Sequence, residues 1–299
     1  MDLTLFSPSG VTLRSTAVRR ALKRLQALGF AATLDRAALA KQQRFAGSDE
    51  ARLEAVHRVA DAAPAVAMAV RGGYGLTRLL DQLQWRRLAR SVERGTRWVG
   101  FSDVTALQLA LLAHTGQGSW AGPCAAEDFG RSDEEGGVDD VTAGCFAEVM
   151  RGELEAVGFR TAPGHDGLGQ RGVLWGGNLA MLCSLLGTPH LPPVKGGILF
   201  LEDVNEHPYR VERMLLQLLQ AGVLGRQKAV LLGDFGGWKP SPLDRGYDFR
   251  AMVDYLRTRT RIPLLTGLPF GHVRTKVCLP VGRRATLAVQ GRDAFIGWA

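Results

Sequence analysis

The chain has 299 residues, of which 46% are hydrophobic and 22% charged, a globular composition that excludes disorder as its main state. At about 150 residues per domain, this length predicts two domains. Lys and Arg number 37 against 29 Asp and Glu, which gives a formal net charge of +8. The basic residues gather at 14–24, 86–97 and 257–261, which we interpret as the solvated faces of amphipathic helices. In the first group, for example, leucines at 22, 25 and 28 alternate with the basic residues. The net positive charge therefore does not by itself predict a nucleic-acid-binding groove. Attraction of an acidic small substrate would explain the same charge equally well.

The four cysteines are far apart in sequence and form no C-x-x-C pair, which indicates buried thiols in a reducing compartment. The N-terminal residues lack the charged and apolar regions of a signal peptide, and no run approaches the 18 apolar residues of a membrane span. We therefore expect a soluble, cytoplasmic protein that is not a partner of membranes.

The first half of the chain alternates strand and helix patterns. Apolar runs predict strands at residues 3–7, 65–70 and 97–101. Apolar residues at helical spacing predict helices at residues 17–28, 51–62, 76–83 and 104–114. This order of strands and helices is typical of a parallel sheet covered on both faces, which we assign to an N-terminal domain at residues 1–126.

The second half begins with a stretch of no sustained period, residues 127–172, which we interpret as the crossing between domains. Strands are then expected at residues 196–201, 229–232 and 286–289, and helices at 212–220 and 249–257. These elements predict a mixed α/β C-terminal domain at residues 173–299.

Ser102 lies in the segment WVGFSDVTAL, between a buried strand that ends at Phe101 and a helix that begins near Val104. A serine in this turn presents its hydroxyl at the carboxyl edge of the sheet, beside the N–H groups of a helix N-terminus. That is the geometry of a nucleophile elbow, although G-x-S-x-G is absent. Ser-Asp is also a good helix N-cap, and the local pattern alone favours capping.

Three glycines in the segment VRGGYGL follow a buried strand and precede a helix. Such a turn lets backbone N–H groups approach an anion, as in an oxyanion hole or a nucleotide site. It matches neither G-x-G-x-x-G nor a Walker loop, and a simple strand-to-helix connection explains it equally well.

Acidic side chains gather at and after the end of the strand at 196–201, at Glu202, Asp203, Glu206 and Glu212. Four acids in this region raise the question of a metal, but they lack a recognisable ligand pattern. His272 lies in the loop LPFGHV. Ser102, a carboxylate and His272 follow one another in the order of a nucleophile, an orienting acid and a base.

Five separated motifs make the chain resemble the LD-carboxypeptidase family of serine peptidases, which includes the microcin-immunity proteins. They are GFSDVTAL, VRGGYGLTRLLDQL, GGNLAMLCSLLGTP, LFLEDVNEHPYRVERMLLQL and LPFGHV with LPVG, and they span nearly the whole chain. The resemblance implies a Ser-Glu-His triad at Ser102, Glu202 and His272. It also implies an oxyanion hole made by the amides of Asp103 and Gly73, with Gly72 as the alternative to Gly73.

The same resemblance implies a hydrolase without metal or cofactor that removes the terminal D-alanine from murein tetrapeptide during cell-wall recycling. It implies a cytoplasmic homodimer with a flavodoxin-like, parallel-sheet N-terminal domain and a smaller mixed α/β C-terminal domain whose sheet is barrel-like. Glu202 is preferred to Asp203 and Glu206 as the acid because it closes the strand in the LED motif.

Two alternatives stay open within this fold. A microcin-immunity-like hydrolase of peptidyl-nucleotide amides would use an aromatic side chain to stack the base, and Trp175 and Trp238 are available. A tryptophan is more often part of a core than of such a site. The other alternative is a non-catalytic peptide-binding module.

Overall fold

The computed structural model describes residues 1–298 of the chain. The chain forms two compact units. Unit 1 comprises Met1–Leu154 and two later segments, Gly187–Pro192 and Arg274–Val281. Unit 2 comprises Glu155–Leu186, Pro193–Val273 and the chain from Gly282 onward.

Unit 1 is built on a six-stranded sheet in the order β11-β5-β4-β3-β1-β2. Its strands are β1 (Asp2–Phe6), β2 (Ala31–Leu34), β3 (Val66–Ala69), β4 (Arg97–Gly100), β5 (Ser119–Ala121) and β11 (Leu279–Val281). The first five pair in parallel, and their order 2-1-3-4-5 is that of a flavodoxin-like sheet. β11 comes from far along the chain and adds an antiparallel edge beside β5. The expected flavodoxin-like parallel sheet is therefore confirmed.

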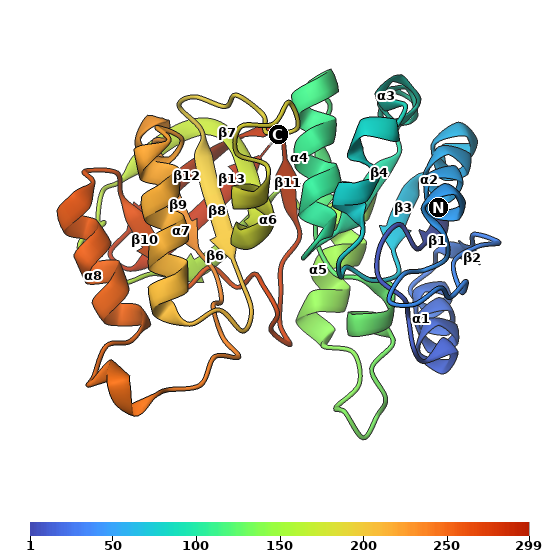
Figure 1. Cartoon of the computed structure of the whole chain (residues 1–299), viewed down its shortest axis with the longest axis horizontal. Helices are drawn as coiled ribbons and strands as arrows, with labels where there is room; N and C mark the ends of the chain where they lie inside the picture. The colour runs from blue at the N-terminus through green and yellow to red at the C-terminus, as the bar shows by residue number, and fades with distance from the viewer. Residues whose placement is uncertain (299) are drawn as a thin grey trace. The chain divides into compact units, whose positions relative to one another are not determined.

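Helices cover both faces of this sheet. They are α1 (Ser15–Ala27), α2 (Asp49–Ala62), α3 (Trp85–Glu93), α4 (Val104–Thr115) and α5 (Asp140–Arg151). α2, α3 and α4 pack in sequence on one face, and α1 lies on the other beside a π-helical turn at Ala125–Phe129 (Figure 1). α1 buries Ala17, Val18, Ala21 and Leu25. Of its basic residues, Arg19 and Lys23 are exposed as the sequence predicted. Arg20 and Arg24 are not solvated in this way, because they donate to main-chain carbonyls of residues 129–131.

The strand order reverses between β1 and β3, which is where open α/β sheets bind ligands. The turns after β1, β3 and β4 all leave the carboxyl edge of the sheet. This topology gathers three segments at one edge, namely the Ser7–Gly10 turn, the Arg71–Gly75 turn and the turn that holds Ser102.

Unit 2 contains a seven-stranded sheet in the order β10-β9-β8-β7-β12-β13-β6. The strands are β6 (Ala156–Arg160), β7 (Gly169–Asn178), β8 (Ile198–Glu202), β9 (Ala229–Leu232), β10 (Leu264–Thr266), β12 (Arg283–Gln290) and β13 (Asp293–Trp298). The helices α6 (Leu179–Ser184), α7 (Pro208–Gln220) and α8 (Phe249–Arg259) pack in that order (Figure 1). β8 and β9 are buried on both faces, whereas β12 alternates between buried and exposed residues.

The sheet of unit 2 curls without closing. Its edge strands are β10 and β6, and they approach where Thr266 N donates to Thr161 Oγ1 at 3.2 Å. The acceptor of this bond is a side chain, and β10 and β6 form no main-chain pairing with each other. The sheet that was expected to be barrel-like is therefore not a closed barrel.

The stretch 127–172, interpreted as a crossing, contains regular structure that its sequence conceals. α5 buries small residues such as Ala143, Cys145 and Ala147, which weaken the apolar period. β6 and most of β7 follow, and the boundary between the units falls after Leu154. Two pieces of the range 173–299 pack in unit 1, where β11 pairs with β5. The helix expected at 76–83 is two short 3-10 turns.

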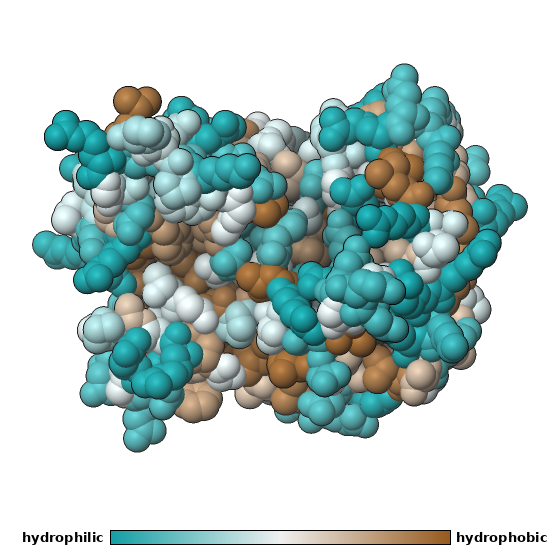
Figure 2. Space-filling model, turned by 90° about the horizontal axis from the view of Figure 1, so that it is seen from below, coloured by the Kyte–Doolittle hydropathy of each residue, from teal (hydrophilic) through white to brown (hydrophobic). Residues whose placement is uncertain are grey.

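On the face drawn in Figure 2, hydrophilic side chains predominate and apolar ones are scattered among them. Within residues 1–298, none of the helices has the length and apolarity needed to cross a bilayer.

Candidate active site

Ser102 adopts a left-handed backbone conformation between β4 and α4, with φ at +61°. A side chain is rarely found in this region, and holding a non-glycine residue there costs about 1–3 kcal/mol. The strain accompanies the sharp reversal from strand to helix, because only three residues separate Gly100 from Val104. The geometry is that of a nucleophile elbow.

Helix capping does not account for this serine. The hydroxyl of Ser102 donates to Asp103 Oδ2 at 3.3 Å. Asp103 is the N-cap of α4, but its side chain makes no capping hydrogen bond. The expected capping of α4 by the Asp103 side chain is therefore not seen.

The glycine turn after β3 packs directly on Ser102. A Cβ atom added to Gly72 would lie 2.9 Å from Ser102 Cβ and 3.1 Å from its Oγ. Gly73 has φ at +81°, and no hydrogen-bond acceptor for its amide is found within residues 1–298. An unbonded N–H beside the elbow is what an oxyanion hole needs.

In unit 2, Glu202 and His272 form a hydrogen bond of 2.8 Å between Oε2 and Nδ1. Glu202 ends the buried strand β8 and is fully buried, whereas the His272 side chain is 21% exposed. A carboxylate on Nδ1 selects the tautomer that carries its proton there, which leaves Nε2 as the basic nitrogen. This pair has the chemistry of an oriented general base.

Asn178 connects this pair to a second carboxylate. Its Nδ2 donates to Glu202 Oε1 and to Asp203 Oδ1, each at 3.1 Å. Its Oδ1 accepts from Met181 N and caps α6. One side chain thus supplies both of its N–H groups to two neighbouring carboxylates. Asn178 belongs to the GGN motif in the sequence, but nothing local distinguishes this role from capping.

Two other acids of the predicted cluster have different partners. Asp203 accepts from Ala180 N at 2.9 Å and Val204 N at 2.9 Å, and burial raises the pKa of its carboxyl to about 6. Glu206 forms an ion pair of 2.6 Å with Arg210. The carboxylate that touches His272 is Glu202.

The two tryptophans considered for base stacking differ in position. Trp175 is fully buried and donates to Gln227 Oε1 at 3.1 Å, so it belongs to the core. Trp238 is partly exposed and packs edge-on against His207, with ring centroids 4.9 Å apart.

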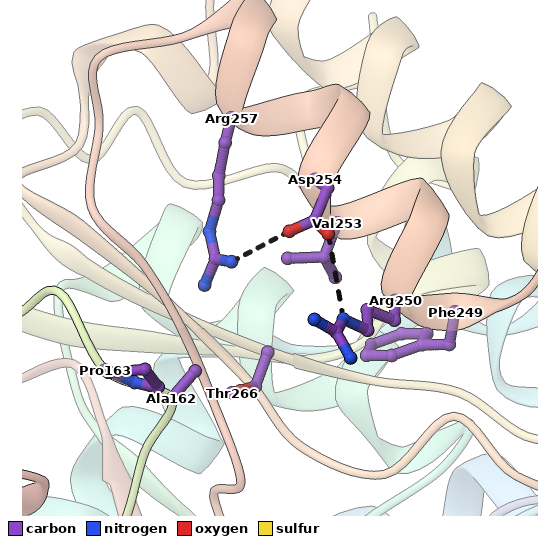
Figure 3. A pocket seen from close by; sticks show the side chains of 8 residues that line it. All are labelled: Ala162, Pro163, Phe249, Arg250, Val253, Asp254, Arg257 and Thr266. Atoms are coloured by element: carbon purple, nitrogen blue, oxygen red, sulfur yellow. Dashed lines mark hydrogen bonds and ion pairs between the residues drawn. The ribbon is translucent and has the colours of Figure 1, made fainter.

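One cavity of unit 2 lies apart from the predicted site residues. Figure 3 shows this cavity of about 440 Å³, where Arg250 and Arg257 flank Asp254 on α8. Its lining also includes Ala162, Pro163, Phe249, Val253 and Thr266. Among residues 1–298, no group of three or more His, Cys, Asp or Glu side chains is arranged to hold a metal ion.

The predicted site residues therefore form two groups. Unit 1 holds Ser102, Asp103 and the glycine turn at Gly72 and Gly73. Unit 2 holds Glu202 and His272. The chain returns from unit 2 to unit 1 directly after the histidine loop, between Val273 and Arg274.

Comparison with known proteins gives the family. Residues 3–122 match the LD-carboxypeptidase N-terminal domain, and residues 171–287 match the LD-carboxypeptidase C-terminal domain. The probable murein peptide carboxypeptidase of Bacillus subtilis is 30% identical over 92% of this chain and 85% of its own. The murein tetrapeptide carboxypeptidase of Pseudomonas aeruginosa is 30% identical over 95% of this chain and 92% of its own.

Solved structures agree. The crystal structure of muramoyltetrapeptide carboxypeptidase from Oxalobacter formigenes is 39% identical, has a TM-score of 0.91, and covers 100% of this chain and 99% of its own. The microcin C7 self-immunity protein in complex with aspartyl sulfamoyl adenosine is 20% identical with a TM-score of 0.86, covers 99% of this chain and 95% of its own, and shares the fold. The two domain matches and the relatives that cover nearly the whole chain indicate the same family. The chain belongs to the LD-carboxypeptidase family and is a serine carboxypeptidase.

Proposed function

We propose that this enzyme hydrolyses the bond between the third residue and the terminal D-alanine of murein tetrapeptide, with Ser102, His272 and Glu202 as its catalytic triad. The observation that carries the proposal is the hydrogen bond between His272 Nδ1 and the buried Glu202, which leaves Nε2 as a base. The strained turn at Ser102 supplies a nucleophile of matching chemistry. The substrate is supported by the names of the relatives in Pseudomonas aeruginosa and Oxalobacter formigenes.

In the acylation step, His272 Nε2 takes the proton of the Ser102 hydroxyl while Oγ forms a bond to the scissile carbonyl carbon. The carbonyl oxygen becomes an oxyanion and receives hydrogen bonds from the amides of Gly73 and Asp103. The C–N bond then breaks, and the imidazolium of His272 gives its proton to the departing amine of D-alanine.

In the deacylation step, water takes the place of the amine. His272 removes a proton from the water, whose oxygen attacks the ester carbon of the acyl-enzyme. Collapse of the second tetrahedral intermediate returns the proton to Ser102 Oγ and releases the shortened peptide. Glu202 keeps its hydrogen bond to His272 Nδ1 throughout and stabilises the imidazolium that forms in each step.

The proposal is tested by mass spectrometry of murein tetrapeptide after incubation with wild-type protein, Ser102→Ala and Ser132→Ala. Wild type and Ser132→Ala, which changes a serine elsewhere in unit 1, are expected to release one D-alanine. Ser102→Ala is expected to lower kcat by several orders of magnitude. Comparable cleavage by Ser102→Ala would overturn the assignment of the nucleophile. Absence of cleavage by wild type would redirect the same assay to peptidyl-nucleotide amides.

The resemblance to the family also supports a cytoplasmic homodimer that acts in murein recycling. Light scattering of the purified protein tests the assembly, and a mass equal to one chain would contradict it.

A further inference from the structure

The turn after β1 packs against the turn that carries the proposed oxyanion donor. Ser9 Oγ donates a hydrogen bond to Gly73 O, and Gly10 N donates to Gly72 O at 3.1 Å. Ser9 is fully buried. A Cβ atom on Gly10 would lie 2.8 Å from Gly72 O, so the approach of the two turns requires glycine there.

These two bonds hold the peptide units on both sides of Gly73. The N–H of Gly73 and the carbonyl of Gly72 belong to the same planar, trans peptide unit and point in opposite directions. When Gly10 N–H binds Gly72 O, the N–H of Gly73 is directed away from the Ser7–Gly10 turn. Ser9 holds the next peptide unit through Gly73 O, which prevents rotation about the other side of the residue.

A buried arginine connects the same two turns at a second place. Arg52 is fully buried, and its Nη1 donates to Pro8 O at 3.1 Å and to Gly75 O at 2.9 Å. Asp49 accepts a hydrogen bond from Arg52 Nη2. The Ser7–Gly10 turn is thereby anchored independently of the hydroxyl of Ser9, so removal of that hydroxyl alone leaves the turn in place.

We propose that Ser9 is a positioning residue of the oxyanion hole, which acts by holding the peptide unit that follows Gly73 and so limits rotation of the Gly73 amide. The inference rests on the proposed function, because it needs Ser102 as the nucleophile and Gly73 as a donor. Ser9 itself touches no reacting atom. Its hydroxyl matters most in the transition state, when the oxyanion first demands a correctly directed N–H.

Ser7 provides a matched control. It is buried in the same turn, and its hydroxyl also donates to a main-chain carbonyl, Ala38 O at 2.7 Å. That carbonyl belongs to a different loop. Ser9→Ala and Ser7→Ala therefore remove equivalent atoms and equivalent hydrogen bonds, but only Ser9→Ala loosens the glycine turn.

The experiment measures kcat and KM on murein tetrapeptide, and the rate constant with which a fluorophosphonate labels Ser102, in wild type and both variants. The phosphoryl oxygen of this probe requires the same oxyanion donors as the substrate. Ser9→Ala is expected to lower kcat and the labelling rate constant about tenfold at nearly unchanged KM, less than the roughly 10²–10³-fold loss of an entire donor. Ser7→Ala is expected to keep both rates while lowering the melting temperature.

The outcomes separate the two claims. Equal rates in wild type and Ser9→Ala, or equal losses in both variants, overturn the role of Ser9 while the nucleophile stands. A wild type that resists the probe overturns the Ser102 assignment and this inference with it. The labelling rate constant belongs to each folded molecule, so a smaller folded fraction of Ser9→Ala does not imitate the expected loss.

Discussion

At the scale of single residues, Asn178 lies between two buried carboxylates and forms a hydrogen bond with each. Glu202 and Asp203 are adjacent and both buried, so their charges repel each other. The amide group between them donates one N–H to each carboxylate, and its bond to Asp203 works to lower the pKa of that carboxyl. Asp203 also accepts two main-chain N–H groups, yet burial still raises its pKa. Asn178 thus holds Glu202 Oε1, while Glu202 Oε2 forms the hydrogen bond with His272.

Glu202→Gln is expected to lower kcat by about 10³–10⁴-fold, because the amide presents an N–H group to His272 and selects the wrong tautomer, as in other serine proteases. Glu206→Gln is the control, since Glu206 pairs with Arg210 and not with the histidine. Steady-state hydrolysis of the tetrapeptide measures both. Similar kcat values for the two variants would argue against Glu202 as the orienting acid.

Asp203 should make the stability of the protein depend on pH. Its pKa is about 6 in the folded protein, above the value of roughly 3.9 in an unfolded chain. As pH rises from about 4 to 6, the unfolded chain loses this proton first, so the free energy of unfolding falls. The total change is on the order of 2–3 kcal/mol and is complete above pH 6.

Urea unfolding of wild type and Asp203→Asn between pH 4 and 7 tests this dependence. The difference in unfolding free energy between the two proteins should change across that interval and be constant above it. A difference independent of pH would show that Asp203 ionises normally.

At the scale of elements, the pairing of β7 with β8 determines where Glu202 lies. Gly176 of β7 is opposite Phe200 of β8, with φ at +134°, and a Cβ atom there would lie 1.9 Å from Phe200 O. Only glycine allows the strands to pair in this register. The register then sets Asn178 opposite Glu202, so the glycine determines the contact between the amide and the acid.

Gly176→Ala is expected to destabilise the protein by about 2–4 kcal/mol, because it combines a steric clash with an unfavourable backbone angle. Gly169→Ala in the same strand meets nothing within 4 Å and should be close to neutral. The midpoints of urea unfolding compare the two. Equal midpoints would mean that β7 shifts to accommodate the methyl group.

At the scale of the whole molecule, a buried ion pair fastens a distant segment into unit 1. Lys276 Nζ lies 2.6 Å from Asp128 Oδ1, and both side chains are almost completely buried. The ammonium group also lies 4.0 Å from the centre of the Phe101 ring, directly before Ser102 in sequence. The segment that follows forms β11 and pairs with β5. The pair therefore links the segment 274–281 to the sheet of unit 1, which carries Ser102.

Lys276→Met should destabilise unit 1 by about 3–5 kcal/mol, since it leaves Asp128 charged and buried without a partner. Adding Asp128→Asn should recover most of this loss, because the amide needs no counterion and still offers an oxygen to Cys124 N. A double-mutant cycle in urea measures the coupling. Additive losses would indicate that the two charges act independently.

The sequence by itself determined the elements whose pattern is local. The buried strands β3, β4, β8 and β9 stand out as apolar runs, and helices such as α1, α2, α4 and α8 stand out by their period. The strand-to-helix turn at Ser102 could be predicted because both elements beside it, β4 and α4, have such patterns. The short strands β2 and β5, and α5 with its small residues, carry too weak a pattern to be predicted in this way.

Only the tertiary structure decided which distant residues meet. The sequence favoured Glu202 over Asp203 and Glu206 as the orienting acid only by its position in a motif. The 2.8 Å hydrogen bond to His272 depends on strand register and on a loop 70 residues away. The contact of Ser9 with Gly73, and the return of the segment 274–281 to unit 1, depend in the same way on the packing of the sheet. Such contacts arise because sheet pairing brings together residues whose separation along the chain says nothing about their distance in space.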